Sequence, residues 1–288
     1  MPACHAAAVH RLQLPTPWGS LLLVGGSRAG EGTVLLLPQL RLALDAGRPA
    51  RALVPATTVC VTHGHLDHIL GVPAWASQRQ LQGMPPGRLV VPAPQGKAFA
   101  GLLERFAALE GGGGYGVEIL EAYDGFTLPL RPAFELVFFT TTHWVPTLGC
   151  CLWWTRQRLR PDLAGLRGEE LAHRRAAGET ITEEVRLPLL AYLGDTDPRV
   201  FDRHPWLTSV EVLITECTFL RPKDRERAAR FGHTHLDDLA ARAATLHNRH
   251  LVLTHLSRRH RLAAGSREIR RRLATFSGQL HLLNSEWE

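Results

Sequence analysis

The stretch Thr62–Gly71, "THGHLDHILG", decides the fold, because it crowds three histidines and an aspartate into six residues. These side chains are His63, His65, Asp67 and His68. Ionisable groups this close perturb one another's protonation, and imidazole is costly to bury without a partner. A cation that takes all four side chains as ligands removes the conflict. The stretch therefore predicts a metal site on a strand-to-helix turn.

The size and composition of the chain favour one soluble domain. Its 288 residues are 45% hydrophobic and 21% charged, which is ordinary for a globular protein, and α/β architectures of this length often form one domain. The apolar run Ser20–Gly26 is too short for an export signal or a membrane span. Five cysteines without a CxxC spacing favour reduced thiols in the cytoplasm. We therefore expect one domain over residues 1–288, in the cytoplasm and with no membrane association.

The basic residues are nearly all arginine and give the chain a net charge of +6. A genome of biased base composition accounts for much arginine, and a solvated helix face is the usual role of a charged run. Two runs are nevertheless dense in arginine: Ser257–Leu273 holds seven, and Thr155–Arg160 holds three beside Trp153 and Trp154. Arginine and aromatic side chains suit phosphates and bases. The candidate RNA contacts are Arg156, Arg158, Arg258, Arg259, Arg270, Arg271 and Arg272.

Short β-like runs, bounded by Gly and Pro, alternate with helical stretches along the chain, a pattern typical of an α/β fold. The expected helices are Leu66–Trp75, Phe99–Leu109 and a piece near Glu169–Ala177. The expected strands are Ser20–Val24, Thr33–Leu37, Leu40–Gly47, Thr57–His63, Phe134–His143, Leu148–Thr155, Leu189–Asp195, Val210–Glu216 and His250–His255.

Residues that commonly bind metals stand at the ends of these strands. They are His63, His143, Asp195, Glu216 and His255. Each one alone has an ordinary explanation, such as a helix cap or a surface histidine. Together with the first cluster, they indicate side chains that converge beyond the edge of a sheet. Oxygen and nitrogen donors without cysteine suit two borderline cations such as zinc, about 3.5–4 Å apart.

The same segments resemble a known family. "HGHLDH" resembles the HxHxDH motif of the metallo-β-lactamase superfamily, and five later segments are similar to ribonuclease Z, the endonuclease that removes 3′ trailers from tRNA precursors, closest to its short forms. The resemblance runs from about Gly32 to His260. It implies a four-layer αββα sandwich with a short inserted arm or cap at residues 155–190. The five segments are "THWVPTLGC" (Thr142–Cys150), "YLGDTDP" (Tyr192–Pro198), "TECTF" (Thr215–Phe219), "FGHTHLDDLA" (Phe231–Ala240) and "LTHLSRRH" (Leu253–His260).

The resemblance also implies a role for each candidate residue. Two divalent ions, zinc with manganese as an alternative, are expected, and a hydroxide that bridges them attacks phosphorus. His233, oriented by Glu216, donates a proton to the departing 3′ oxygen, and Asp67 joins them as a catalytic residue. Asp45 is the aspartate that orients a ligand histidine. The expected ligands are His63, His65 and His143 for the first ion, Asp67, His68 and His255 for the second, and Asp195 as the bridge.

The expected substrate is a tRNA precursor, and the family resemblance favours a homodimer. The segment 155–190 is either a reduced tRNA clamp or a cap over a small-molecule pocket. A cyclic-nucleotide phosphodiesterase or a lactone or lactam hydrolase on the same scaffold therefore remains an alternative, although Glu216 with His233 favours phosphodiester cleavage. A metal-free binding scaffold is disfavoured because no ligand position is missing. The chain departs from the family's pattern at Thr147, Thr234 and His260, where the family has Ser, Ser and Tyr.

Overall fold

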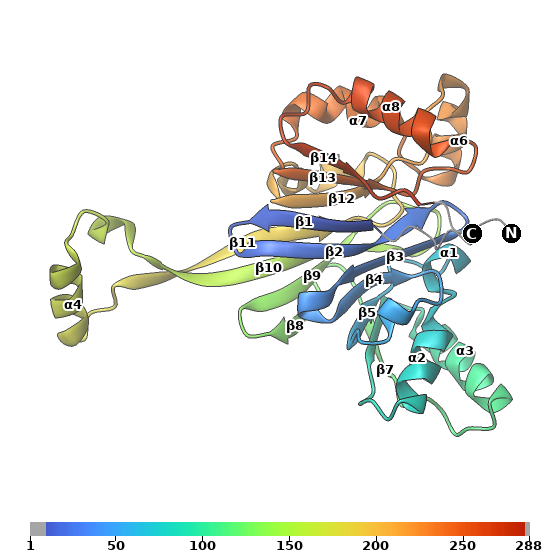
Figure 1. Cartoon of the computed structure of the whole chain (residues 1–288), viewed down its shortest axis with the longest axis horizontal. Coiled ribbons are helices and arrows are strands. Elements are labelled where there is room, and N and C mark those ends of the chain that lie inside the picture. Colours follow the sequence, from blue (N-terminus) through green and yellow to red (C-terminus); the bar gives the residue numbers. More distant parts are fainter. Residues whose placement is uncertain (1–9, 286–288) are drawn as a thin grey trace, which may run out of the picture.

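Two seven-stranded mixed sheets form the body of the protein, and helices lie on the outer face of each (Figure 1). The computed structural model describes residues 10–285. The first sheet runs in chain order through β1 (His10–Thr16), β2 (Gly19–Arg28), β3 (Gly32–Leu37), β4 (Leu42–Ala46), β5 (Thr58–Cys60), β6 (Arg88–Pro92) and β7 (Glu118–Ala122). In the second sheet, neighbouring strands also follow one another in the chain, from β8 (Thr127–Arg131) at one edge through β9 (Phe134–Thr140), β10 (Leu148–Leu159), β11 (Thr182–Tyr192), β12 (Val212–Glu216) and β13 (His250–Thr254) to β14 (Gln279–Leu282) at the other.

The helices complete four layers, so the predicted α/β αββα sandwich is confirmed. Buried side chains of α2 and α3 pack on the first sheet, and those of α5, α7 and α8 pack on the second. The helices are α1 (Leu66–Ile69), α2 (Val72–Leu81), α3 (Gly96–Leu109), α4 (Gly168–Ala176), α5 (Val200–Arg203), α6 (Arg225–Phe231), α7 (Leu236–Arg242) and α8 (Leu262–Arg272).

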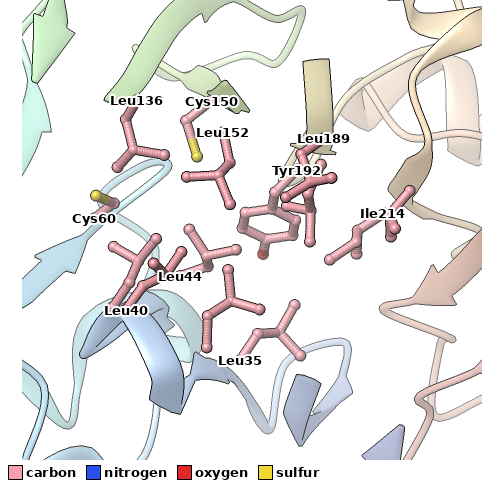
Figure 2. Packing of buried hydrophobic residues seen from close by; sticks show 14 of the residues in the cluster. Leu35, Leu40, Leu44, Cys60, Leu136, Cys150, Leu152, Leu189, Tyr192 and Ile214 are labelled. Carbon is pink, nitrogen blue, oxygen red and sulfur yellow. The ribbon is translucent and has the colours of Figure 1, made fainter. Parts of the chain in front are cut away.

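The main core lies between the two sheets. Leu35 and Leu44 from the first sheet meet Leu136 and Ile214 from the second, and the ring of Tyr192 lies among these aliphatic side chains (Figure 2). All five are at most 1% exposed. Each large apolar side chain buried in this way contributes about 1.5–3 kcal/mol of transfer free energy. The core therefore fixes the two sheets against each other and sets the positions of their strand ends.

The helix expected at Leu66–Trp75 is wrong as a single element, because α1 and α2 are separate. The break falls at Leu70 and Gly71, where the Gly71 N–H donates to the carbonyl of Ala46 on β4 at 2.6 Å. Pro73 is the second residue of α2, and proline has no N–H to continue a preceding helix. The break ties the turn that carries the histidine cluster to the end of β4.

Several sheet elements were not expected from the sequence. These are β1, β6, β7, β8 and β14, and Leu40 lies in a 3₁₀ turn before β4 instead of within a strand. Strand β7, with one buried residue of five, and β14, with none, have exposed or half-exposed patterns. Edge strands of this kind lack the continuous apolar run by which the buried strands are found.

Strands β10 and β11 extend beyond the body as a two-stranded arm that ends in α4 (Figure 1). Their antiparallel pairing continues to Arg158 opposite Glu183 and Leu159 opposite Thr182. An ion pair joins Arg158 to Glu183 along the arm. Because its residues pair mainly with one another, the arm reaches outward without support from the sandwich.

The cysteines that the structure describes are all free and buried, namely Cys60, Cys150, Cys151 and Cys217. Burial raises the pKa of each of these thiols. Cys4 lies outside the described residues. Within residues 10–285 no helix has both the length and the apolar character needed to cross a bilayer.

Gly194 makes a close approach between the sheets possible. It has φ +61°, and a Cβ built on it would lie 2.7 Å from both Cβ and Cγ2 of Thr62. The side chain of Thr62 cannot give way freely, because its hydroxyl is held by the Asp45 carboxylate. Only glycine satisfies both the left-handed backbone and the contact.

We therefore expect Gly194→Ala to lower the free energy of unfolding by about 1–3 kcal/mol, through strain and displacement of Thr62. Gly101→Ala is the matched control, because Gly101 lies inside α3 with nothing within 4 Å of its added Cβ. Alanine there should raise stability by about 0.5–1 kcal/mol. Urea denaturation of both variants measures the difference in the free energy of unfolding. A Gly194→Ala variant as stable as Gly101→Ala would contradict the contact.

Candidate metal centre

The structure brings all seven expected ligands together beyond the strand ends. These side chains fall into groups, and within each group the ligand atoms lie within 4.8 Å of one another. The contributing elements are the loop after β5 (His63 and His65), α1 (Asp67 and His68) and the residues that follow β9 (His143), β11 (Asp195) and β13 (His255).

The first group consists of His63, His65, His143 and Asp195. The Nδ1 atom of His65 lies 3.0 Å from Nε2 of His63 and 3.4 Å from Nε2 of His143. An Asp195 oxygen lies 3.7 Å from Nε2 of His63. Two nitrogens bound to one tetrahedral zinc ion at 2.0–2.1 Å are about 3.4 Å apart. The spacing of this group therefore fits a single zinc-sized ion.

The second group consists of Asp67, His68 and His255. The Nε2 atoms of the two histidines are 3.4 Å apart, and Oδ2 of Asp67 lies 3.4 Å from Nε2 of His255. The carboxylate of Asp195 also faces this group, 3.5 Å from Nε2 of His68 and 3.3 Å from Nε2 of His255. Asp195 thus lies between the two groups and contacts both.

The hydrogen bonds of the histidines test whether a cation fits. Four of them direct Nδ1 away from the centre toward an oxygen that can accept its proton, so that Nε2 is the nitrogen that faces the centre. The Nε2 atoms face one another and carboxylates, so the arrangement needs positive charge, from protons or from a cation bound between the side chains. Burial alone would lower the pKa of His68, but the Asp195 and Asp45 carboxylates raise it well above its usual value, so a bound cation would displace a proton there. The Nδ1 contacts are His63 to Thr62 at 3.0 Å, His68 to Asp45 at 2.7 Å, His143 to the Gly232 carbonyl at 3.0 Å and His255 to Thr218 at 3.0 Å.

The electrostatics of the centre favour cations as well. Burial alone would raise the pKa of Asp195, but His255 and His68 lower it well below its usual value. Burial also lowers the pKa of His63 and of His65, so these imidazoles stay neutral and keep their lone pairs. Ionised carboxylates beside neutral imidazoles are the form in which these side chains bind divalent metals.

Asp45 is completely buried and anchors the centre from behind. Its oxygens accept from the Thr62 N–H at 2.7 Å and the Tyr192 hydroxyl at 2.6 Å, besides His68. The register of β3 against β4 shifts at Val34, which leaves Asp45 as the extra residue of a bulge with φ +59°. A bulge re-aims a side chain in this way beside many active sites.

Sequence reasoning missed Tyr192, Thr218 and Gly232 as parts of the centre. Tyr192 reaches Asp45 across the interface between the sheets, so no local spacing reveals the contact. Thr218 lies within "TECTF", and its hydroxyl donates to Glu216 while it accepts from His255. The signal in the sequence that could have identified Thr218 is its position two residues after Glu216, a glutamate at the end of a strand.

Glu216 and His233 lie beside the ligands as a hydrogen-bonded pair. The His233 Nδ1 atom is 2.8 Å from Oε1 of Glu216, which also accepts from the Thr196 N–H at 2.9 Å. Burial alone would lower the pKa of His233, but the Glu216 carboxylate raises it to about 9. His233 is therefore held as an imidazolium whose side chain keeps 14% exposure. His233 also forms a group with Asp195 and His255 that could hold a metal ion. The alternative role for His233 is therefore that of a metal ligand instead of a proton donor.

Most of the arginines expected to contact RNA have partners within the protein. Carboxylates pair with Arg158, Arg258, Arg271 and Arg272. The guanidinium of Arg156 lies over the Trp154 ring at 5.5 Å, and Arg270 donates weakly to the Leu280 carbonyl at 3.4 Å. The side chain of Arg259 is exposed. Existing ion pairs reduce what these side chains gain by binding phosphate.

His260, which stands where the family has Tyr, is buried and hydrogen-bonded inside the protein. It is 4% exposed, and its Nε2 accepts from the Leu220 N–H at 3.3 Å. Burial and the Arg221 guanidinium lower its pKa to about 4, which keeps it neutral as an acceptor.

Comparison with known proteins places this centre in a family. The family model described as "Beta-lactamase superfamily domain" matches residues 29–256. The metallo-beta-lactamase fold protein YhfI from Bacillus subtilis covers 97% of this chain and 98% of its own, with a TM-score of 0.63 at 14% identity. That likeness establishes the shared fold.

Two sequence relatives define the family more closely. The chain is 32% identical over 249 residues to tRNase Z TRZ2, chloroplastic, of Arabidopsis thaliana, and the match covers 84% of this chain and 69% of that protein. It is also 32% identical over 249 residues to Ribonuclease Z of Pyrobaculum islandicum, which covers 76% and 77%. The chain belongs to the beta-lactamase superfamily and, within it, to the family of tRNase Z and ribonuclease Z.

The Asp45 contacts generate a test of the centre. Asparagine in its place keeps the shape but loses the charge and one acceptor, so His68 is no longer held with Nδ1 protonated. We expect Asp45→Asn to weaken zinc binding by about 10–100-fold. Titration against a competing chelator measures the affinity. Asp162→Asn, on the arm and in an exposed ion pair, is the control and should change it less than twofold; the same small effect for Asp45→Asn would count against its role.

Proposed function

We propose that this protein is a metal-dependent endoribonuclease of the ribonuclease Z type, which removes 3′ trailers from tRNA precursors. The observation that carries the proposal is the Glu216–His233 pair beside the seven converging ligands. A metal hydroxide alone suffices to open a lactone or lactam ring, whereas a nucleotide 3′ oxygen is a poor leaving group that needs a proton. The names of the sequence relatives support the same activity.

Two divalent ions complete the proposed site, zinc first and manganese as the alternative. His63, His65 and His143 would hold one ion, and Asp67, His68 and His255 the other, with Asp195 serving both. Nitrogen and oxygen donors without thiolate support this assignment. Divalent ions bound there supply an activated water at neutral pH and stabilise negative charge on the phosphate.

The residues of the chain itself perform the remaining tasks. Glu216 fixes the His233 ring through Nδ1 and keeps it charged, so that Nε2 is the proton donor to the departing 3′ oxygen. Asp67 accepts from the Gly30 N–H at 2.6 Å through Oδ2, the oxygen that also faces His255. This bond holds the carboxylate in the orientation that catalysis requires.

The wider assignment follows from the same proposal. The whole chain acts as one domain, and its arm at residues 155–190 contacts the tRNA with help from arginines such as Arg156 and Arg259. A second copy of the chain is the expected partner, supported by the exposed apolar side chains of Leu66 on α1, Leu70 between α1 and α2, and Leu81 on α2. A cytoplasmic location is part of the proposal, although the Arabidopsis relative is named as chloroplastic.

The direct test incubates the zinc-loaded protein with a tRNA precursor and, separately, with bis-p-nitrophenyl phosphate. We expect cleavage of both substrates, with the precursor cut at the junction between tRNA and trailer. Sequencing of the product ends locates the cut. Hydrolysis of the small diester alone would replace this proposal with a small-substrate phosphodiesterase.

His233→Ala tests the proton donor. Because p-nitrophenolate leaves readily as an anion, we expect kcat on bis-p-nitrophenyl phosphate to change little while RNA cleavage falls by about two orders of magnitude or more. Metal analysis of the same preparation should still find both ions. Glu216→Ala should follow the pattern more mildly, because it orients and charges the ring without donating.

Equal losses on the two substrates, together with loss of a metal ion, would identify His233 as a ligand in the group that it forms with Asp195 and His255. The proton donor would then have to be another side chain.

A further inference from the structure

Trp144 is an exposed aromatic residue at the mouth of the metal centre. It directly follows the ligand His143 in the chain and is 65% exposed. Its ring centroid lies 6.0 Å from that of His65, another expected ligand. An indole left largely in water adds little to the stability of the fold, since most of its apolar surface is not buried.

The surrounding structure holds this tryptophan in place. Its ring meets the edge of Phe231, at the end of α6, with centroids 5.8 Å apart. The next residue, Gly232, accepts from Nδ1 of His143 at 3.0 Å, which ties the segment of Trp144 to the end of the helix. Pro146 follows two residues later and restricts the backbone of Val145. The Trp144 ring is therefore held in place relative to the expected metal ligands.

Two cations lie beside Phe231, the residue whose ring Trp144 contacts. Arg227 and Arg230 are exposed on α6, and their guanidinium carbons lie 5.3 and 5.4 Å from the Phe231 ring centroid. Within residues 10–285 neither forms an ion pair, whereas Arg225 on the same helix is bound to Asp237 and Asp238. Guanidinium groups without an ion pair, separated from an exposed indole by one aromatic ring, provide the mixture of positive charge and aromatic surface that binds single-stranded nucleic acid.

We propose that Trp144 is the stacking platform for a nucleobase next to the scissile phosphate, and that Arg227 and Arg230 contact phosphates of the adjoining single strand. This subsite rests on the proposed ribonuclease function and adds to it the residue that positions the RNA. Every base has a flat π-face, so the platform accepts any of the four. It positions the strand without selecting its sequence.

A second exposed aromatic residue offers the alternative location. Tyr123 is 61% exposed and lines a cavity of about 450 Å³ that also reaches His143. Asp124 lies in the wall of that cavity, where its carboxylate repels a phosphate. The charge around the two rings therefore favours Trp144, and Tyr123 becomes the matched comparison.

The first experiment measures stacking directly. Single-stranded RNA with 2-aminopurine on either side of the cleavage junction is bound to zinc-loaded protein in the His233→Ala background, in which cleavage is slow. We expect quenching of the 2-aminopurine at one of these two positions, abolished by Trp144→Ala, retained in part by Trp144→Phe and unchanged by Tyr123→Ala. Unchanged quenching in Trp144→Ala, no quenching at either position, or loss only in Tyr123→Ala would overturn the proposal.

The second experiment tests the same contact during cleavage. An abasic nucleotide at the quenched position and Trp144→Ala are each expected to lower kcat/KM for the precursor about tenfold. Because both remove one stacking contact, the two changes combined should cost no more than either alone. Multiplied losses would overturn the proposal, and Trp144→Phe with near-normal kcat/KM separates loss of the ring from misfolding.

The outcomes distinguish this proposal from the function on which it rests. If the wild-type protein does not cut the precursor, the ribonuclease assignment fails. The quenching experiment needs binding alone, so its result still decides whether Trp144 stacks with a base.

Discussion

The convergence of imidazole nitrogens and carboxylates on a small volume is the constraint on which the rest of this structure depends. Nitrogens 3.0–3.4 Å apart need a proton or a metal cation between them, because two lone pairs at that distance repel each other. The chain orients four of the five imidazoles, those of His63, His68, His143 and His255, by placing an oxygen beside the outer nitrogen, on Thr62, Asp45, Gly232 and Thr218. These four rings are therefore oriented before any metal binds, which lowers the cost of ordering them.

Both sheets are needed to build this arrangement. Asp45 belongs to the first sheet and Tyr192 to the second, and their 2.6 Å hydrogen bond joins the sheets behind the ligands. Asp45 and His255 both have left-handed backbones, at φ +59° and +61°. Such conformations are costly for residues other than glycine and persist where the surrounding structure holds them. The packed core between the sheets is what holds them here.

The features that could be predicted from the sequence are local or repeated. The cluster at His63–His68 is recognisable because four metal-binding side chains fall within six residues. The positions of His143, Asp195 and His255 at strand ends indicated them as candidates without knowledge of which strands are neighbours. The four layers followed from the resemblance and from the alternation of strands and helices. These signals lie along the chain, where spacing can be counted.

The features that could not be predicted depend on distant contacts. The bulge at Asp45 arises from pairing between β3 and β4, and the Tyr192 hydroxyl finds its partner only when the sheets pack. Likewise, nothing in the arginine run at the C-terminal end reveals that Arg272 is bound to Asp237 of another helix. A count of charges therefore overstated the surface available to RNA, while the unpaired Arg227 and Arg230 were not singled out.

The measurement that tests the central claim most directly is anomalous diffraction from crystals grown with zinc, recorded on both sides of the zinc absorption edge. The account predicts two peaks about 3.5–4 Å apart, one among His63, His65 and His143 and the other among Asp67, His68 and His255, with Asp195 in contact with both. A single peak, or one coordinated by His233, would contradict the claim that these seven side chains form one dinuclear centre.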